Sequence, residues 1–188
     1  MSKVANPCKV ITGPETRWSY ANVWEPKSIN GGTPKYSVSL LIPKTDTETL
    51  DRISAALRAA YEEVKGRLKT AGGIIPALEN LKLPLRDGDQ ERPGDPEYAG
   101  CMFINANSTT APGIVDANRK TILERSEVYS GVYGRASVTF YAFSVNGNRG
   151  IACSLNNLQK IRDGKPMGSR ASAADDFALD DDEDECPF

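Results

Sequence analysis

The chain has no histidine among its 188 residues. Imidazole is the usual general base of Ser-His-Asp and Cys-His catalytic groups, and HExxH metal sites require it as a ligand. Those sites are therefore excluded. No apolar run approaches the roughly 20 residues of a membrane span, and the N-terminal stretch MSKVANPCKV lacks an apolar signal core. We expect no membrane association and a cytoplasmic protein.

Cysteine is scarce and widely spaced, at positions 8, 101, 153 and 186. No CxxC pair occurs, so the spacing does not fit a zinc knuckle. Without a signal peptide, we expect reduced thiols. We expect neither a metal nor another cofactor.

Basic and acidic residues are present in similar numbers but are unevenly distributed along the chain. The whole chain carries 23 basic and 25 acidic residues, yet residues 175–188 hold eight acidic residues and no basic one. The remaining 174 residues therefore carry 23 basic and 17 acidic side chains. A basic body suits a polyanionic partner, whereas a block of like charges repels itself and stays disordered. The composition predicts a folded domain over 1–168 and a disordered acidic tail over 169–188.

The end of the tail combines acidic side chains with a terminal aromatic ring. Such a segment suits capture by an apolar pocket rimmed with cations on a partner protein, and it can also compete with nucleic acid for the basic body. An inert solubilising tail is the alternative. The residues assigned to partner binding are Asp180, Asp181, Asp182, Glu183, Asp184, Glu185, Pro187 and Phe188.

Alternating apolar residues and turn signals predict a mainly β body. An Asn-Gly pair at 146–147 between two β runs is a strong hairpin signal. Short strands at even spacing, without βαβ alternation, favour a small closed antiparallel barrel. The pattern indicates a five-stranded OB-fold barrel of Greek-key type. The expected strands cover 8–13, 17–24, 35–43, 98–108, 112–116, 135–145 and 149–161.

One amphipathic α-helix is expected at about 47–69, inserted after the third strand. Its apolar residues recur at helical spacing from Leu50 to Leu68, and either Thr45 or Asp46 can cap its start. The polar segment at about 84–97 is rich in Gly and Pro and is expected to be a mobile loop. Its carboxylates suggest a metal-dependent nuclease as an alternative, but they match neither the EF-hand spacing nor a set of carboxylates carried on a helix.

Aromatic residues interleaved with basic residues on strands indicate binding of single-stranded nucleic acid. Aromatic faces stack on bases while Lys and Arg follow the phosphates. Simple alternation places Trp18, Tyr20 and Trp24 on one strand face, opposite Ala21 and Val23 on the core side. The asparagines of the stretches 104–108 and 155–159 could hydrogen-bond bases. The predicted binding residues are Arg17, Trp18, Tyr20, Trp24, Lys35, Arg119, Tyr129, Tyr133, Arg135, Tyr141, Phe143 and Arg149.

Several stretches resemble a family of tailed-phage single-stranded DNA-binding proteins, once classed as a domain of unknown function. They are KYSVSLLIPKTD, APGIVD, EVYSGVYGRASVTFYAF and, most specifically, RGIACSLNNLQKIRDGKPMGSR, at 35–46, 111–116, 127–143 and 149–170. The resemblance covers about residues 5–170. The acidic tail ending in Phe is also similar to bacterial single-strand-binding proteins, although Cys186 stands where those have an aliphatic residue.

The resemblance implies an OB-fold protein that coats single-stranded DNA in phage replication and recombination, without catalysis and independently of sequence. It implies a tail that recruits phage or host replication and recombination proteins, in the cytoplasm of the host cell. A homodimer is left open. The alternative is a phage adaptor or regulatory module whose acidic tail mimics DNA.

Overall fold

The computed structural model describes residues 6–28, 30–145 and 147–167. The acidic segment expected over 169–188, including the partner-binding residues assigned to it, lies outside the described residues. Strands predominate, as predicted, and no described helix is long and apolar enough to cross a bilayer. The strands are β1 (Lys9–Ile11), β2 (Arg17–Lys27), β3 (Lys35–Pro43), β4 (Leu85–Asp87), β5 (Cys101–Ser108), β6 (Gly113–Val115), β7 (Tyr133–Val145) and β8 (Asn148–Arg162).

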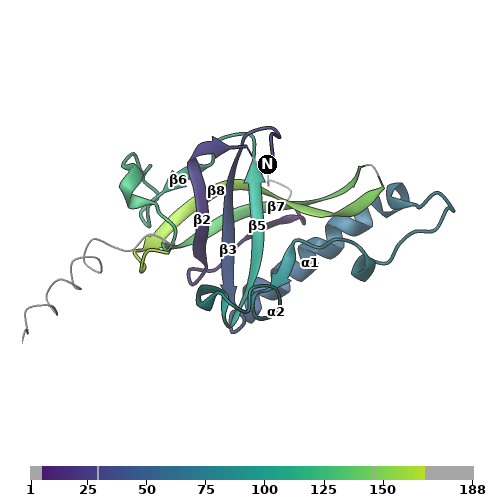
Figure 1. Ribbon diagram of the computed structural model, residues 1–188, viewed down its shortest axis with the longest axis horizontal. Helices are drawn as coiled ribbons and strands as arrows, with labels where there is room; N and C mark the ends of the chain where they lie inside the picture. The colour runs from purple at the N-terminus through teal and green to yellow at the C-terminus, as the bar shows by residue number, and fades with distance from the viewer. Residues whose placement is uncertain (1–5, 29, 146, 168–188) are drawn as a thin grey trace, which may run out of the picture.

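Five of these strands close into a barrel in the order β7, β2, β3, β5 and β8, with β8 returning to β7 (Figure 1). This closure is the OB-fold arrangement that the sequence predicted. The barrel is not wholly antiparallel, however, because β5 pairs with β8 in the parallel direction at Asn107 and Ser154. The pairing β6–β8 is parallel as well. The predicted mainly β OB-fold is therefore confirmed, and within the five-stranded barrel the β5–β8 pair alone departs from the expected antiparallel pattern.

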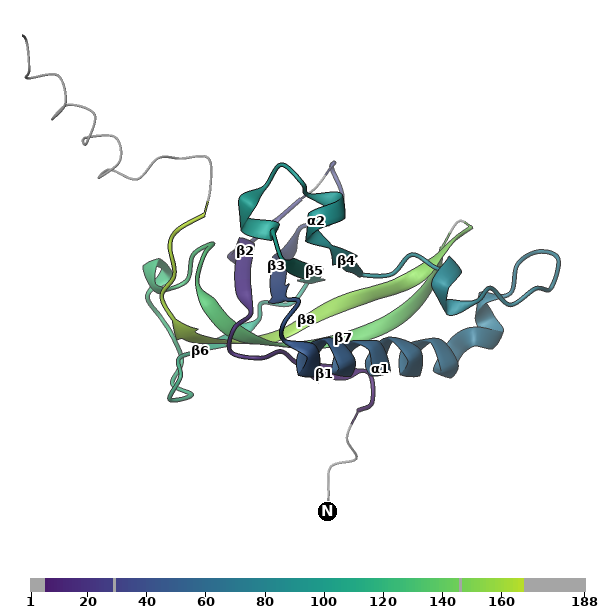
Figure 2. The same ribbon diagram turned by 90° about the horizontal axis from the view of Figure 1, so that it is seen from below.

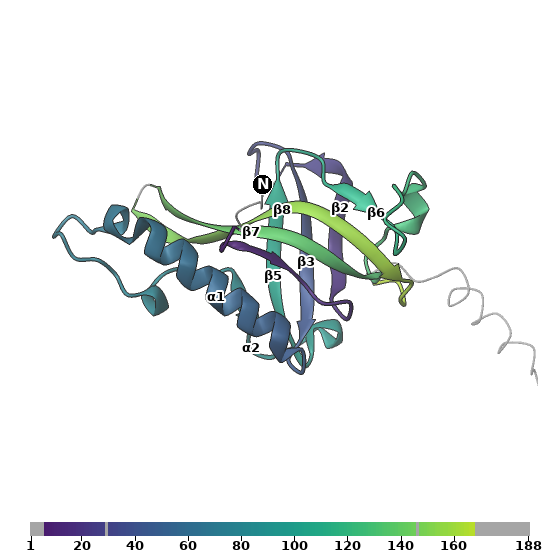
Figure 3. The same ribbon diagram turned by 180° about the vertical axis from the view of Figure 1, so that it is seen from behind.

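The main helix α1 (Thr47–Val64) follows β3 and continues into the 3-10 helix η1 (Lys65–Leu68), close to the predicted range. Asp46 is its N-cap, and the Asp46 carboxylate accepts the Thr49 N–H at 3.2 Å. Ile53 and Leu57 face the barrel core and are buried. Viewed from behind, α1 lies alongside β1 and β7 and follows the β7–β8 hairpin outward (Figure 3).

Four further short helices complete the described part of the chain, and the last of them follows β6. They are η2 (Leu78–Asn80), α2 (Gly88–Glu91), η3 (Pro96–Tyr98) and η4 (Arg125–Glu127). The segment from Leu85 to Gly100, containing β4, α2 and η3, is called the strap below. It crosses one side of β3 and β5, whereas α1 lies on the opposite side of the molecule (Figure 2).

The strap is folded, which corrects the expectation of a mobile loop at 84–97. β4 pairs with β5, and Lys44 Nζ bridges Asp87 and Asp89 at 2.9 and 2.7 Å. Each carboxylate raises the pKa of Lys44, and Lys44 lowers the pKa of both aspartates in return. Gly88 is required here, because a Cβ at this position would clash with the backbone oxygen of Tyr98. These contacts come from distant residues, so local composition could not indicate them.

Candidate nucleic-acid interface

The side of β2, β3 and β5 that points away from the barrel interior is called the outer face. Strand register arranges its side chains in cross-strand rows, since paired residues of neighbouring strands lie on the same side. The rows change from polar near the β2–β3 turn to apolar near α1. In that order they are Asn22–Ser37–Asn107, Ser19–Ser39–Asn105 and Arg17–Leu41–Phe103.

The strap covers the apolar end of the outer face through one aromatic residue. The Tyr98 ring meets Phe103 edge to face with centroids 5.1 Å apart. Its hydroxyl group lies 3.4 Å from Ser19 Oγ and 3.2 Å from Ser39 Oγ. Tyr98 is 1% exposed. Among the described residues, the polar end of the outer face, where Asn105 is exposed, is therefore the part that remains open to a ligand.

A bulge in β2 presents Tyr20 at the edge of this open region. Pairing of β2 with β3 shifts between Ser19 and Asn22, and Tyr20 adopts a left-handed φ of 47°. Such a φ is uncommon outside glycine and is found where a fold re-aims a side chain. The Tyr20 ring is 56% exposed, so one aromatic side chain is available for stacking on a base.

Arg92 of the strap lies against the Tyr20 ring. Its guanidinium carbon is 5.4 Å from the Tyr20 ring centroid and 5.0 Å from that of Tyr98. Arg92 Nη1 also donates to the Tyr20 hydroxyl oxygen at 3.3 Å. A cation is thus held beside the exposed ring, in the combination that suits a phosphate next to a stacked base.

The open end of the outer face leads to a hollow at the β2–β3 turn, called the lysine hollow below. Neither of its lysines forms an ion pair within the described residues. Two unneutralised cations beside amide and hydroxyl groups make a surface suited to a polyanion. The hollow is lined by Lys27, Gly32, Thr33, Lys35, Ser37 and Asn107.

A second hollow, called the tyrosine hollow below, lies beside Tyr20 and contains two carboxylates. Glu97 is neutralised there by Arg17 at 2.8 Å. The last described residue, Met167, is among the lining residues, and its N–H donates to Ser130 O at 2.8 Å. The described part of the chain therefore ends at the margin of the outer face. The lining residues are Ser19, Tyr20, Asp95, Glu97, Tyr98, Ser130 and Met167.

The structure corrects the role expected for Trp18. Its side chain is 0% exposed, and its indole N–H donates to Gly134 O at 3.1 Å inside the barrel. No face of the ring can reach a base, so Trp18 is a core residue. The β2 bulge is the cause, because it puts Trp18 and Val23 on the same inner side although five positions separate them.

Other aromatic and arginine side chains that were predicted to bind DNA make contacts within the protein itself. The Tyr133 ring is contacted by the guanidinium groups of Arg17 and Arg162, at 5.3 and 4.0 Å from its centroid. Tyr129 donates its hydroxyl hydrogen toward Gly164 O at 2.9 Å. Arg135 Nε donates to Thr12 O at 3.2 Å. These side chains stabilise the barrel and the start of the C-terminal segment.

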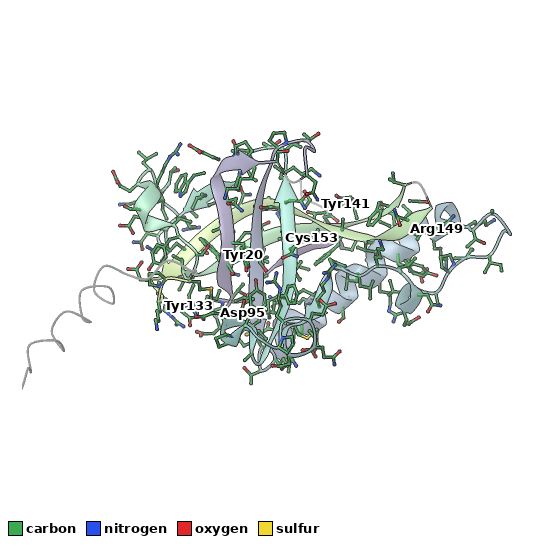
Figure 4. The ribbon with its side chains drawn as sticks, viewed as in Figure 1. Tyr20, Asp95, Tyr133, Tyr141, Arg149 and Cys153 are labelled. Carbon is green, nitrogen blue, oxygen red and sulfur yellow. The ribbon has the colours of Figure 1, made fainter. Side chains whose placement is uncertain are left out.

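The predicted residues do not all converge on one surface. Tyr133 lies on the same side of the molecule as Tyr20 and Asp95 of the strap, whereas Tyr141 and Arg149 lie farther along the molecule toward the other end (Figure 4). Tyr141 is 45% exposed on β7, and Phe143 is half-buried farther along that strand. Trp24 is half-buried, with its indole N–H 3.4 Å from Val128 O. Arg119 lies in the turn after β6. Of the twelve, Tyr20 and Lys35 stand on the open outer face, and Arg17 lies at its covered end.

Sequence reasoning missed two cations of this surface. Lys27 fell in a segment interpreted as a turn, although β2 extends to it. Arg92 fell in the segment interpreted as a mobile loop. Asn105 and Asn107 were within the asparagine-rich stretch that the sequence did single out.

The carboxylates considered for a metal-dependent nuclease form ion pairs in the strap. Within the described residues, no three carboxylate or thiol side chains lie close enough together to hold a metal ion. Asp87 and Asp89, the carboxylates that a nuclease would use, pair with Lys44. Burial raises the pKa of the Cys153 thiol far above its usual range, which leaves it protonated and unreactive.

Comparisons with known proteins identify a family to which the chain is similar. A family profile described as the ssDNA-binding protein of Enterobacter phage Enc34 matches residues 8–187. Protein p50 of Acyrthosiphon pisum secondary endosymbiont phage 1 is 31% identical over 166 residues, which are 86% of this chain and 88% of that protein.

Solved structures share the fold at lower sequence identity. The bacteriophage Enc34 single-stranded DNA-binding protein in complex with ssDNA is 24% identical, with a TM-score of 0.69 over 86% of this chain and 90% of that one. The single-stranded DNA-binding protein gp2.5 of bacteriophage T7 is 12% identical, with a TM-score of 0.60 over 87% of this chain and 97% of that one.

Proposed function

The chain belongs to the family of the phage Enc34 ssDNA-binding protein, and on that basis we propose that its outer face binds single-stranded DNA. The observation that carries the proposal is the continuity between the exposed Tyr20 ring, the Asn and Ser row, and the lysine hollow. Bases stack on the ring and bond to the amides, while phosphates meet the cations. Binding is independent of sequence and involves no catalysis. The protein acts in phage DNA replication and recombination in the host cytoplasm.

We test the outer face by replacing Tyr20. Tyr20→Asn keeps a residue that tolerates the left-handed backbone while it removes the ring. Loss of one stacked base corresponds to about 1–3 kcal/mol, so the dissociation constant for oligo-dT should rise about 5- to 150-fold. Fluorescence anisotropy at low salt measures this change.

The matched control is Tyr141→Ala, which removes a tyrosine of similar exposure from β7. Affinity should stay within about twofold of the unaltered protein, because Tyr141 is outside the outer face. Equal loss from both replacements would place the DNA elsewhere. Absence of oligo-dT binding by the unaltered chain would contradict the function itself.

The acidic segment is proposed to compete with DNA for the outer face and to recruit replication and recombination proteins. Its point of departure supports the first role, since Arg17 Nη2 donates to Lys165 O and Met167 lines the tyrosine hollow. A segment tethered at the margin of a basic surface has a high effective concentration there.

Deleting residues 168–188 should therefore tighten binding of oligo-dT, roughly three- to tenfold at low salt, with less effect at high salt where charges are screened. The control keeps the length and neutralises the acidic residues 180–185 with Asn and Gln. Both variants should behave alike in gel-shift titrations. Unchanged affinity in both would exclude competition while leaving partner recruitment to be tested by pull-down with replication proteins.

A further inference from the structure

The molecule is elongated, with the tip of the β7–β8 hairpin at one end and β6 near the other (Figure 1). At one end, residues 65–82 lie beside the tip of the β7–β8 hairpin and form what is called the wing below. Arg149 holds the two parts of the wing together, since its guanidinium donates to Lys69 O at 3.2 Å and to Gly147 O at 3.4 Å. At the other end, residues 116–127 pack beside the end of β8.

The wing exposes apolar side chains among cations. Ile74, Ile75 and Val145 are 67%, 41% and 58% exposed, which is unusual for three large aliphatic residues at one tip. Residues 65–82 contain four basic residues and one acidic residue, and they keep a net positive charge although Lys65 pairs with Glu62 of α1 at 2.8 Å. The wing is therefore an apolar surface with a positive charge.

The opposite end has a hollow with the complementary character, called the acidic hollow below. Leu123 at its rim is 84% exposed, and four carboxylates line it. Lys160 in its wall is 8% exposed and already pairs with Glu127 and Asp163, at 2.9 and 2.7 Å. The remaining carboxylates, Asp116 and Glu124, meet no described cation within ion-pair distance.

We propose that the wing of one copy docks in the acidic hollow of a second copy of this chain. Burial of Ile74 and Ile75 against Leu123 supplies apolar contact, and the opposite charges align the two ends. A second copy is the favoured occupant because one chain carries both complementary surfaces at opposite ends. Pairing of either surface with itself is opposed by like charge.

Such a contact is heterologous, and because its two surfaces lie at opposite ends of an elongated molecule, the proposed docking adds copies in a row along a DNA strand. The consequence rests on the proposed function: copies bound to one DNA strand would contact their neighbours, and binding to a long strand would be cooperative. A short oligonucleotide that holds one copy would not report this contact.

The test uses charge reversal at each end in the full-length protein. Lys69→Glu and Glu124→Lys should each lower the cooperativity parameter on long oligo-dT roughly tenfold, because like charges then face one another. Affinity for a short oligo-dT should be unchanged. The double variant Lys69→Glu with Glu124→Lys restores the opposite charges and should recover most of the cooperativity. Ile74→Asp should likewise lower the cooperativity on long oligo-dT and leave the affinity for a short oligo-dT unchanged.

Arg58→Glu is the matched control, since it reverses an exposed charge on α1 away from both ends and should leave cooperativity unchanged. The docking proposal is overturned if the single reversals leave cooperativity intact, or if the double variant is no better than the single ones. It is also overturned if Lys69→Glu weakens the short oligo-dT equally, because the wing would then contact DNA directly. Failure of the unaltered chain to bind short oligo-dT would instead contradict the proposed function.

Discussion

Replacing Lys27 and Lys35 together with glutamine is expected to weaken binding of oligo-dT at least about tenfold at low salt. These two lysines face the same hollow at the β2–β3 turn, beside the open row of the outer face. Each phosphate contact on a single strand contributes about 0.7 to the slope of log affinity against log salt concentration. The magnitude of that slope should fall by about 1.4.

The slope is the decisive measurement, because it counts the lost phosphate contacts independently of any small change in folding. Lys9→Gln with Lys120→Gln is the matched control, since both residues are exposed and neither lies on the outer face. That pair should alter the slope by much less than the Lys27 and Lys35 pair. Equal slopes for the two double variants would mean that DNA does not pass through the lysine hollow.

Trp18→Ala is expected to lower the free energy of unfolding by about 3–5 kcal/mol, the range for removing a large aromatic residue from a packed core. The ring is fully buried, donates to Gly134 O, and packs so closely on Gly134 that a side chain there would overlap it. Urea unfolding measures the loss. Tyr20→Ala is the surface comparison and should change stability far less.

A fluorescence experiment separates the core role of Trp18 from a role in stacking. In a Trp24→Phe background, Trp18 is the only tryptophan in the chain. Its emission should be blue-shifted, as expected of a buried indole, and should not be quenched by saturating oligo-dT. Strong quenching would contradict the buried position and restore Trp18 to the binding surface.

Much of the fold was predictable because its signals are local. The β3 range agrees with the alternation of KYSVSLLIP, and β7 ends at Val145 and β8 begins at Asn148, on either side of the predicted hairpin turn. The Asp46 cap and the apolar stripe likewise place α1 near its observed range. The Greek-key barrel follows from strand number and spacing, but the parallel β5–β8 pair joins distant residues that no local pattern connects.

The binding surface was harder to predict because one extra residue changes which face a side chain takes. Simple alternation predicts that Trp18 and Tyr20 lie on the same face of the strand. The bulge beyond Ser19 instead leaves Trp18 buried in the barrel and Tyr20 exposed. A bulge has no firm sequence signature at a non-glycine residue. The position of Arg92 depends on the folding of the strap. Lys44, which lies outside the strap, stabilises that folding through its ion pairs with Asp87 and Asp89.

The closure of the barrel also has a consequence for how the protein is made. β2, β3 and β5 are synthesised first, whereas β7 and β8, which join their two edges, come last. Until then, Leu40 and Ile104 belong to an open sheet with an uncovered apolar side and free edges. Pairings between such distant segments form slowly, and uncovered sheets associate with one another. Nascent or truncated chains that end before β7 should therefore need a chaperone or accumulate as aggregates.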